Sequence, residues 1–500
     1  MHSLPALDDF RAVYQQGRAQ VVWTRLVADL ETPVSAMLKL ADGQQNAFLL
    51  ESVEGGSTRG RYSFIGLKPD ILWRSRGAKA EINRQARTTP DAFEDAGETM
   101  PSLRALLAES RIDLPAALPP MAAGLIGYMG YDMIRQVERL PDENPDTINI
   151  PDSIFMRPTV MAIFDNVDGL VTVVTPVRPQ DGISADVAYT QARERLSDIT
   201  ADFERNLPYR REANRTVDEA PTPVANVSRS GFHDMIRKAK EYIAAGDIFQ
   251  VVLSQRFRIP FRLPPFALYR ALRRTNPSPF LFHLQLGGFA LVGSSPEILV
   301  RLRDGKVTIR PIAGTRPRGK TAEEDRALAE DLLADPKELA EHLMLLDLGR
   351  NDVGRVSQIG SVSVTDKMII ENYSHVMHIV SNVEGTLDAS KHDAMDALMA
   401  GFPAGTVSGA PKVRAMQIID ELESERRSFY AGAVGYFSAN GQMDTCIALR
   451  TALVKDGEMI VQAGAGVVAD SDPDKEWEEC HNKARALVRA AEEAVKFAGR

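Results

Sequence analysis

The stretch Pro311-Ile-Ala-Gly-Thr-Arg-Pro-Arg-Gly-Lys-Thr321 decides between two fold classes. Gly314 to Thr321 matches the P-loop pattern G-x-x-x-x-G-K-T, in which backbone N–H groups hold the phosphates of a nucleotide. A candidate strand, Lys306 to Arg310, precedes the motif, and a helix-like run, Ala322 to Leu333, follows it. Further along, Met344-Leu-Leu-Asp347 resembles a Walker B motif. Taken alone, these patterns indicate an ATPase or a GTPase.

The residues around the motif argue against a P-loop. A P-loop strand lies in a parallel sheet covered on both faces and is continuously apolar, whereas Lys306-Val-Thr-Ile-Arg310 alternates like a half-exposed antiparallel strand. Asp304-Gly305 is a hairpin turn signal that pairs this strand with Glu297 to Arg303. Pro317 removes a backbone donor from the loop, and Glu338 to Leu348 has helical periodicity. A P-loop NTPase is therefore kept only as a distant alternative.

Composition narrows the class of protein. The chain has 500 residues, of which 44% are hydrophobic and 25% charged, enough for two or more units with large cores. Its formal net charge of −9 argues against nucleic acid or an anionic membrane as the main partner. Cys446 and Cys480 cannot form a disulfide framework, and no apolar run is long enough to span a bilayer. Because the first residues lack the features of a signal peptide, we expect a cytoplasmic protein.

The pattern of the chain changes near residue 207. Residues 1–206 mix short strands and helices; residues 74–100 among them are expected to form a loop, and residues 155–176 a hairpin. Residues 207–228 are rich in Arg, Pro, Asn and Thr and are predicted to be a linker between this part and residues 229–500.

Residues 229–500 carry clear helix and strand patterns. Helices are expected at Gly231 to Ala245, Pro264 to Arg274, Thr321 to Leu333, Lys337 to Leu348, Pro411 to Leu422 and Asp474 to Phe497. Strands are expected at Phe249 to Phe257, Phe289 to Val292, His375 to Val383, Gly432 to Ser438 and Met443 to Val454. The turns Ala439-Asn-Gly441 and Lys455-Asp-Gly457 predict a meander of the last strands. Antiparallel strands with interspersed helices predict an α+β fold, with antiparallel sheets packed against helices.

Two of the expected helices each carry a pair of glutamates on one face. Glu338 and Glu341 are three residues apart, as are Glu476 and Glu479, and Lys483 falls one turn further along. Two such pairs facing each other would form a cage of oxygens for a hard cation such as Mg²⁺, which takes one or two carboxylates and completes its shell with water and substrate. The alternative is that each pair is a solvated acidic helix face.

A series of motifs in order along the chain resembles the chorismate-utilising enzymes and, among them, component I of anthranilate synthase. In the C-terminal part they are Gly246-Asp-Ile-Phe-Gln-Val-Val-Leu-Ser-Gln255, Asn276-Pro-Ser-Pro279, Gly293-Ser-Ser-Pro-Glu297, Pro311-Ile-Ala-Gly-Thr-Arg-Pro-Arg-Gly319, Leu346-Asp-Leu-Gly-Arg-Asn-Asp-Val-Gly354, Ser374-His-Val-Met-His378, Pro403-Ala-Gly-Thr-Val-Ser-Gly-Ala-Pro-Lys412, Ala448-Leu-Arg-Thr451, Ala463-Gly-Ala-Gly466 and Asp470-Ser-Asp-Pro473. The N-terminal part adds Leu49-Leu-Glu-Ser52, Arg61-Tyr-Ser-Phe64 and Gly127-Tyr-Met-Gly-Tyr131. The resemblance implies the chorismate-utilising enzyme fold. It also implies an N-terminal domain at 1–206 with a tryptophan regulatory site, and a chorismate-binding catalytic domain at 229–500.

Enzymes of this family convert chorismate and ammonia to anthranilate and pyruvate in tryptophan biosynthesis. The resemblance implies that Glu297 is the general acid that protonates the departing 4-hydroxyl group. His378 is the implied proton-transfer group near the leaving enolpyruvate, since histidine titrates near neutrality. Thr406, in a Gly-rich loop before a helix, is expected in an anion-binding geometry beside them.

The same resemblance implies how substrate and metal are held. Glu341 and Glu479 are the implied Mg²⁺ ligands, with Glu338 and Glu476 behind them or acting through water, so that the ion holds the ring carboxylate of chorismate. The remaining implied substrate-binding residues are Arg450 and Tyr430 for the enolpyruvyl carboxylate, Gly464 and Gly466 where backbone must approach the ligand, Gly314 and Thr315 for the ring carboxylate, and Lys483 to offset the acidic cage.

Two positions indicate the branch of the family. Relatives that add water to chorismate have a lysine base at the position of Gln250, and glutamine cannot act as that base. Aminodeoxychorismate synthases have a lysine at the position of Ala313, and alanine cannot form the covalent adduct that such a lysine allows. Both residues predict anthranilate as the product, and aminodeoxychorismate synthase component I is the alternative.

The resemblance also predicts partners. Neither Cys446 nor Cys480 lies in a nucleophile turn, so a separate glutamine amidotransferase subunit, component II, is the expected ammonia source in a hetero-oligomer. A site for L-tryptophan as inhibitor is expected at Glu51, Ser52, Pro277, Ser278, Pro279, Phe280 and Cys446, with Glu51 pairing with the ligand's ammonium group. The alternatives are that these are ordinary core and turn residues, or that the chain is a non-catalytic tryptophan sensor.

Overall fold

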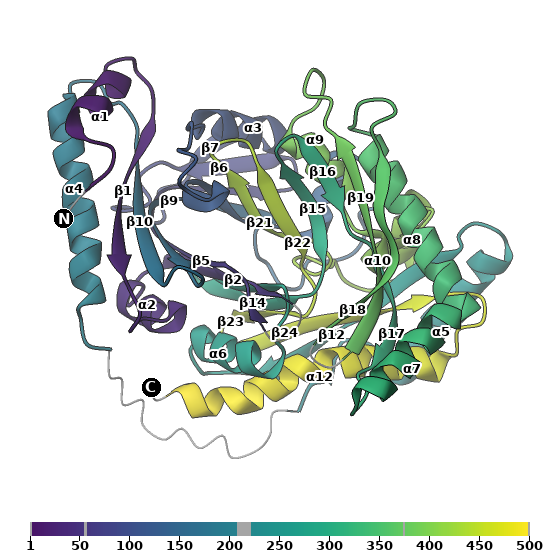
Figure 1. The fold of residues 1–500 in the computed structure, drawn as a ribbon. Helices are drawn as coiled ribbons and strands as arrows, with labels where there is room; N and C mark the ends of the chain where they lie inside the picture. Colours follow the sequence, from purple (N-terminus) through teal and green to yellow (C-terminus); the bar gives the residue numbers. More distant parts are fainter. Residues whose placement is uncertain (1–2, 55–57, 208–221, 374–375, 499–500) are drawn as a thin grey trace.

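The computed structural model describes residues 3–54, 58–207, 222–373 and 376–498 (Figure 1). Within these ranges twenty-two strands are hydrogen-bonded into one sheet, and two more, β3 (Val53–Glu54) and β4 (Thr58–Arg59), form a small ribbon. The predicted linker falls largely on residues 208–221, and the predicted start of a strand at His375 falls on 374–375, so both lie outside the described residues. Strands from the N-terminal and C-terminal parts pair directly, β2 with β13 and β8 with β21.

The large sheet branches into two layers. The first runs, in order of pairing, through β1 (Gln20–Val27), β10 (Leu170–Val177), β9 (Ser153–Asp165), β5 (Tyr62–Arg76), β2 (Asn46–Glu51), β13 (Phe280–Leu286), β14 (Phe289–Ser295), β23 (Thr451–Lys455), β24 (Glu458–Val467) and β12 (Gln250–Pro260). The second starts at β9 and runs through β8 (Gly124–Met129), β21 (Ala433–Ser438), β22 (Met443–Ile447), β15 (Ile298–Arg303) and β16 (Lys306–Ile309) to β19 (Val376–Thr386). Both β17 (Ile312–Pro317) and β18 (Ser363–Asn372) also pair with β19. Short strands β6 (Lys79–Asn83), β7 (Glu94–Glu98), β11 (Val224–Ala225) and β20 (Gly409–Ala410) pair at the edges.

Alternating side chains fill the space between the layers. In β2, Phe48 packs with Phe282 and Leu291 of the first layer and with Ile126 and Val434 of the second. The residues on either side of Phe48 face the opposite way and pack in a different core under the outer helices. Burial of both faces makes the register of these strands specific, because a shift by one residue would exchange the two faces.

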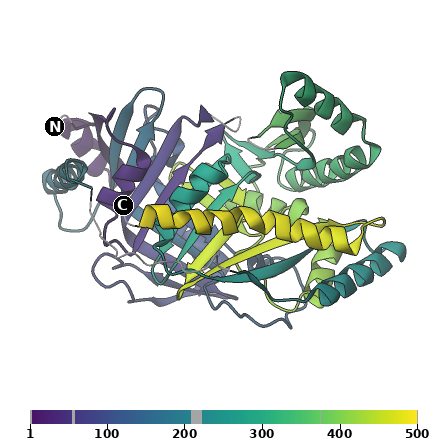
Figure 2. The same ribbon diagram turned by 90° about the horizontal axis from the view of Figure 1, so that it is seen from below.

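Helices cover the outer faces (Figures 1 and 2). On the first layer lie α1 (Leu7–Tyr14), α2 (Pro33–Leu40), α4 (Ala185–Phe203), α6 (Pro265–Thr275) and the long α12 (Pro473–Ala498). Helices α5 (Arg229–Ala244) and α11 (Lys412–Leu422) contact β12 of the first layer, and α3 (Thr99–Glu109) contacts β5, β6 and β7. The second layer is covered by α9 (Ala394–Gly401) on β15 and by α7 (Ala322–Ala334) and α8 (Pro336–Gly354) on β17 and β19, with the single turn α10 (Gly405–Ser408) nearby. The α+β prediction is confirmed. Within the described ranges, no helix combines the length and apolar character needed to cross a bilayer.

The structure contradicts the P-loop alternative. The two strands β15 and β16 form the predicted antiparallel hairpin, with Arg303 opposite Lys306, and Asp304 and Gly305 in the turn have φ of 51° and 75°. The motif itself begins inside strand β17, which pairs antiparallel with β19, and only its last residue, Thr321, reaches a helix, as the N-cap of α7. The Walker B-like residues lie in helix α8. No phosphate-cradling loop is therefore formed here.

Two predictions, one of a loop and one of a single long strand, were wrong. Residues 74–100, predicted to be a loop, contain the end of β5, strands β6 and β7 and the start of α3. Most of their charged residues face solvent while Ala80 and Ile82 are buried, a pattern that a polar edge hairpin shares with a loop. Residues 443–454, predicted as one strand, form two strands because the chain bends at Arg450, where φ is 49°. The first then pairs with β15 and the second with β14.

Candidate active site

Glu297 lies in the sharp connection between β14 and β15 and is only 7% exposed. The Thr406 hydroxyl donates to both carboxyl oxygens, at 3.2 and 3.3 Å, and the Ile312 backbone N–H adds a third hydrogen bond. Burial raises the pKa of Glu297 to about 8, against the opposing effect of the Thr406 hydrogen bond. The carboxyl group is therefore protonated at neutral pH, as a general acid must be.

His378 lies near the start of β19, between β17 and β18. Its Nδ1 is 3.0 Å from the Gly314 carbonyl oxygen and 3.1 Å from Thr315 Oγ1. A carbonyl oxygen can only accept, so Nδ1 carries the proton and Nε2 has the free lone pair. Burial lowers the pKa of His378 to about 4, so the ring is neutral and able to accept a proton.

A bulge in β17 brings these groups to His378. The register of β17 against β19 shifts between Ala313 and Thr315, and Gly314 between them has φ of 74°. A Cβ at Gly314 would lie 3.1 Å from a carboxyl oxygen of Glu338. Glycine is thus required both by the backbone conformation and by the closeness of α8.

Arg450 faces the same site from the bend between β22 and β23. Its positive charge lowers the pKa of Glu297 and of His378, which places the guanidinium near both groups. Among the residues that the structure describes, no group forms a hydrogen bond or ion pair with this partly buried guanidinium. A buried cation without a partner is costly, and a carboxylate of the substrate would supply the missing acceptors.

The glycines of β24 make room for protein side chains. A Cβ at Gly466 would lie 2.7 Å from Gln250 Nε2, and one at Gly464 would lie 2.8 Å from the Tyr430 hydroxyl. The Gly464 carbonyl accepts a hydrogen bond of 2.9 Å from Lys483 Nζ. Gly464 and Gly466 were predicted to lie where the backbone approaches the ligand. Their first neighbours in the structure are two other predicted site residues.

We expect Gly464→Ala to displace Tyr430 and destabilise the fold. The new Cβ would also be 3.0 Å from the Leu253 carbonyl oxygen, a backbone atom that cannot move away freely. Overpacking of this kind costs about 1–3 kcal/mol, measurable by denaturant unfolding. Gly288→Ala is the matched control, because nothing lies within 4 Å of its Cβ position. Equal stability of the two variants would contradict this packing.

The four glutamates come from α8 and α12, as predicted. The structure brings the helices together at an ion pair of 2.9 Å between Lys337 and Asp470, which precedes α12. Burial raises the pKa of Glu341, and the neighbouring carboxylates of Glu338 and Glu479 raise it further. Carboxylates that repel one another in this way are suited to a cation between them.

Each glutamate also has a protein partner. Gln250 Nε2 donates to Glu341 at 3.1 Å, and Lys483 pairs with Glu479 at 2.7 Å. Arg316 contacts Glu338 at 3.3 Å, and Ser471 forms a hydrogen bond with Glu476. Within the described ranges, no three acidic, histidine or cysteine side chains are close enough to form a ready metal cluster. The donors fit a Mg²⁺ ion that takes one or two carboxylates and relies on substrate and water for the rest.

A buried ion pair that sequence reasoning missed supports the site. Arg427 pairs with Glu423 at 2.6 Å, and its guanidinium donates to the carbonyl oxygens of Val407 and Val252 at 2.7 Å. It therefore fixes α10, which carries Thr406, against β12, which carries Gln250. The spacing of four residues between the two charges was the only sequence signal.

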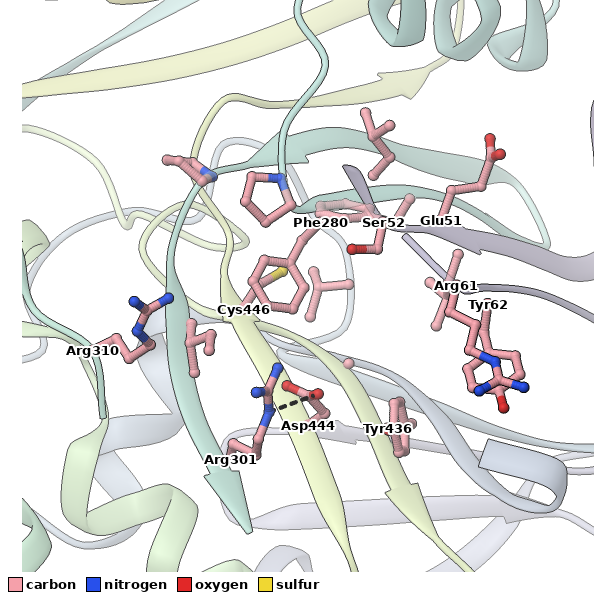
Figure 3. Close-up of a pocket in the computed structure, with 18 of the residues that line it drawn as sticks. Glu51, Ser52, Arg61, Tyr62, Phe280, Arg301, Arg310, Tyr436, Asp444 and Cys446 are labelled. Atoms are coloured by element: carbon pink, nitrogen blue, oxygen red, sulfur yellow. Dashed lines mark hydrogen bonds and ion pairs between the residues drawn. The ribbon is translucent and has the colours of Figure 1, made fainter. Parts of the chain in front are cut away.

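A cavity of about 920 Å³ lies between the layers (Figure 3). Of the seven residues predicted to bind tryptophan, Glu51, Ser52, Pro279, Phe280 and Cys446 line it, whereas Pro277 and Ser278 do not. Glu51 is already bound, because Arg273 donates to both of its oxygens, at 2.6 and 2.9 Å, and Tyr269 donates at 2.5 Å. A ligand ammonium group would have to share this carboxylate.

Comparison with known proteins agrees with this geometry. Residues 48–489 match the family of chorismate binding enzymes. The chain is 59% identical to anthranilate synthase component 1 of Cereibacter sphaeroides over 99% of both chains, and 47% identical to that of Aquifex aeolicus over 97% of both. The chain belongs to the anthranilate synthase component I family of chorismate-binding enzymes. The family and the enzyme class predicted from the sequence are confirmed.

Solved structures show the same fold. Anthranilate synthase component I from Streptococcus pneumoniae superposes with a TM-score of 0.74 at 37% identity, covering 86% of this chain and 92% of that one. The menaquinone-specific isochorismate synthase of Escherichia coli, at 21% identity, superposes with a TM-score of 0.69 and covers 97% of this chain and 99% of its own. The second likeness concerns the fold alone.

Proposed function

We propose that this chain catalyses the Mg²⁺-dependent conversion of chorismate and ammonia to anthranilate and pyruvate in tryptophan biosynthesis. The observation that carries the proposal is the buried carboxyl group of Glu297, which is bound by Thr406 and lies near the guanidinium of Arg450. A buried neutral carboxyl group beside a carboxylate receptor suits a dianionic substrate whose hydroxyl group must leave as water. The product assay that closes the Discussion tests it.

Two steps follow from these residues. In the first, ammonia forms a bond to carbon 2 and gives up a proton to solvent, the ring double bonds shift, and the bond from carbon 4 to oxygen breaks as Glu297 gives its proton to the hydroxyl group, which leaves as water. In the second, the proton on carbon 2 is removed and the bond from carbon 3 to oxygen breaks, which releases enolpyruvate and leaves the aromatic ring. Nε2 of the neutral His378, with Nδ1 fixed by Gly314, accepts the proton from carbon 2, and protonation of the released enolpyruvate then gives pyruvate.

The residues at the branch positions support this product over the alternatives. Gln250 donates its amide to Glu341 and carries no basic nitrogen, so it cannot activate water as a lysine would. Ala313 is buried at 9% exposure and offers no nucleophile for a covalent adduct. Aminodeoxychorismate synthesis therefore stays the second candidate, and the identity of the aminated product separates the two.

Mg²⁺ is proposed as the cofactor. The ion would be held by Glu341 and Glu479, with Glu338 and Glu476 through water, and would bind the ring carboxylate and neutralise its charge. The ion pair of Glu338 with Arg316 favours such an indirect role for Glu338. The nearby Lys483 limits the net negative charge of this cluster before the cation arrives.

We expect Glu479→Gln to raise the Mg²⁺ concentration for half-maximal activity by about tenfold or more, the size of effect expected when one ligand to a bound ion is weakened. The matched control is Glu478→Gln, which removes the same charge from the neighbouring, exposed position of α12. A magnesium titration of the steady-state rate checks both variants. If both shift the titration equally, the effect is one of general charge and Glu479 is no ligand.

The proposal includes two partners. Component I names one part of a larger enzyme, and we propose that a separate glutamine amidotransferase subunit delivers ammonia to this chain in a hetero-oligomer. Burial raises the pKa of Cys446 and of Cys480, so neither thiol is poised as the nucleophile of a glutaminase. L-Tryptophan is proposed as an inhibitor that occupies the 920 Å³ cavity, supported by the five predicted residues that line it.

A further inference from the structure

The regulatory cavity and the catalytic site share a wall. Pro296 and Ile298, the neighbours of Glu297 in the chain, both line the cavity, and so does Ile312, whose backbone N–H donates to the Glu297 carboxyl group. The end of β18, up to Tyr373, forms another part of the lining. An occupant of the cavity therefore contacts the segments that hold the catalytic groups.

Glu371 links this wall to His378. The two residues lie directly opposite each other on β18 and β19, so their side chains share one face of the sheet. The negative charge of Glu371 raises the pKa of His378, against the larger effect of burial, which shows that the two groups interact. Glu371 also lines the cavity.

Two side chains fix the Glu371 carboxylate. Arg310 donates to one oxygen at 2.5 Å, and the hydroxyl group of Tyr373 donates to the other at 3.2 Å. Tyr373 then meets His378 edge to face, with ring centroids 5.2 Å apart and planes at 71°. Arg310, Glu371 and Tyr373 all line the cavity, and Arg310 is the cation among them, so it is the one that a ligand carboxylate would contact (Figure 3).

We propose that Arg310, Glu371 and Tyr373 couple the occupancy of the cavity to the position of His378. A ligand carboxylate drawn to Arg310 competes with Glu371 for the guanidinium. The released Glu371 shifts its bond with Tyr373, and the Tyr373 ring moves against His378. The three are positioning residues, and they make tryptophan binding oppose the proton transfer of the second step. The inference rests on the proposed function, in which tryptophan occupies this cavity.

The test separates tryptophan binding from inhibition in the Tyr373→Phe variant. This change keeps the ring against His378 and removes the hydroxyl group that reaches Glu371. Tryptophan affinity is measured by calorimetry, and inhibition by the rate of anthranilate formation, on the full-length chain with ammonium as nitrogen source. We expect the dissociation constant to stay within about threefold while the inhibition constant rises about tenfold or more, within the usual range of coupling between two sites.

Arg303→Lys is the control for a substitution that alters the lining of the cavity without touching Arg310, Glu371 or Tyr373. Arg303 also lines the cavity, but it pairs with Asp444 at 3.4 Å and has no contact with Glu371 or His378 within the described part of the chain. Its binding and inhibition constants should change together or not at all. Glu371→Gln provides a second relay variant, with the same expected separation, if Tyr373→Phe does not fold.

The outcomes distinguish the relay from the function on which it rests. If the dissociation constant and the inhibition constant of tryptophan change by the same factor in Tyr373→Phe and in Glu371→Gln, while the wild-type chain is inhibited, the relay is overturned and the regulatory site remains. Loss of tryptophan binding in Tyr373→Phe would make Tyr373 a ligand contact and also overturn the relay. A wild-type chain that binds no tryptophan would overturn the regulatory site and the relay together.

Discussion

Glu297→Gln is expected to lower kcat for anthranilate formation by about 10²- to 10⁴-fold, the range that a positioned general acid contributes. Glutamine keeps the size of the side chain and can still accept the Thr406 hydrogen bond, so the local packing is preserved. It cannot give a proton to the leaving hydroxyl group. Substrate affinity should change little, because the carboxyl group acts on the transition state. Steady-state kinetics with ammonium and Mg²⁺ checks this result.

The pH dependence of the rate is a second test of the role of Glu297. The active form of Glu297 is the protonated one, and its pKa of about 8 predicts that the rate, corrected for the concentration of free ammonia, falls as pH rises through that value. The Thr406 hydrogen bond stabilises the ionised form and lowers this pKa. Thr406→Val should therefore move the fall in rate to higher pH. A variant profile with its limb at lower pH would contradict the assignment.

Arg450→Lys is expected to lower kcat/KM for chorismate by about 10²- to 10³-fold, or about 3–4 kcal/mol, because one ammonium group cannot replace two parallel bonds from a guanidinium to a carboxylate. The positive charge is retained, so the variant isolates the geometry of the contact. Arg450→Met removes the charge as well and should be slower still. The comparison also controls for the backbone bend, since lysine and methionine both adopt φ of 49° with similar difficulty.

These effects should fall mainly on KM if Arg450 binds the ground state and on kcat if it binds only the transition state. Its position beside both Glu297 and His378 allows either. Activity of Arg450→Lys within about threefold of the parent chain would exclude the proposed carboxylate contact, because charge-assisted hydrogen bonds are worth more than that.

Periodicity and turn chemistry predicted much of the fold. The helices that carry the four glutamates were visible as spacings of three and four, and Asp304-Gly305 correctly indicated an antiparallel hairpin in place of a P-loop strand. The bend at Arg450 was not visible, because an arginine at positive φ has no signature in an apolar run. Its cause is tertiary: the strands on either side pair with different neighbours.

The motifs indicated which residues belong to the candidate site, but not which residues surround and hold them. Gly464 and Gly466 were expected to face the ligand, yet their nearest neighbours are Tyr430 and Gln250. Nothing in the sequence near Glu51 indicates that Arg273, more than 200 positions away, neutralises it. Glu371 was missed for the same reason, because its opposition to His378 depends on the register of two strands. Pairings between distant segments carry no local pattern.

The most direct test is a product assay on the purified chain with chorismate, Mg²⁺ and ammonium at alkaline pH, read by mass spectrometry. We predict equal amounts of anthranilate and pyruvate, loss of both on addition of a chelator, and recovery on return of Mg²⁺. Aminodeoxychorismate or isochorismate as the product would contradict the roles given to Ala313 and Gln250. Unchanged chorismate, with nucleotide hydrolysis in a parallel reaction, would contradict the account as a whole.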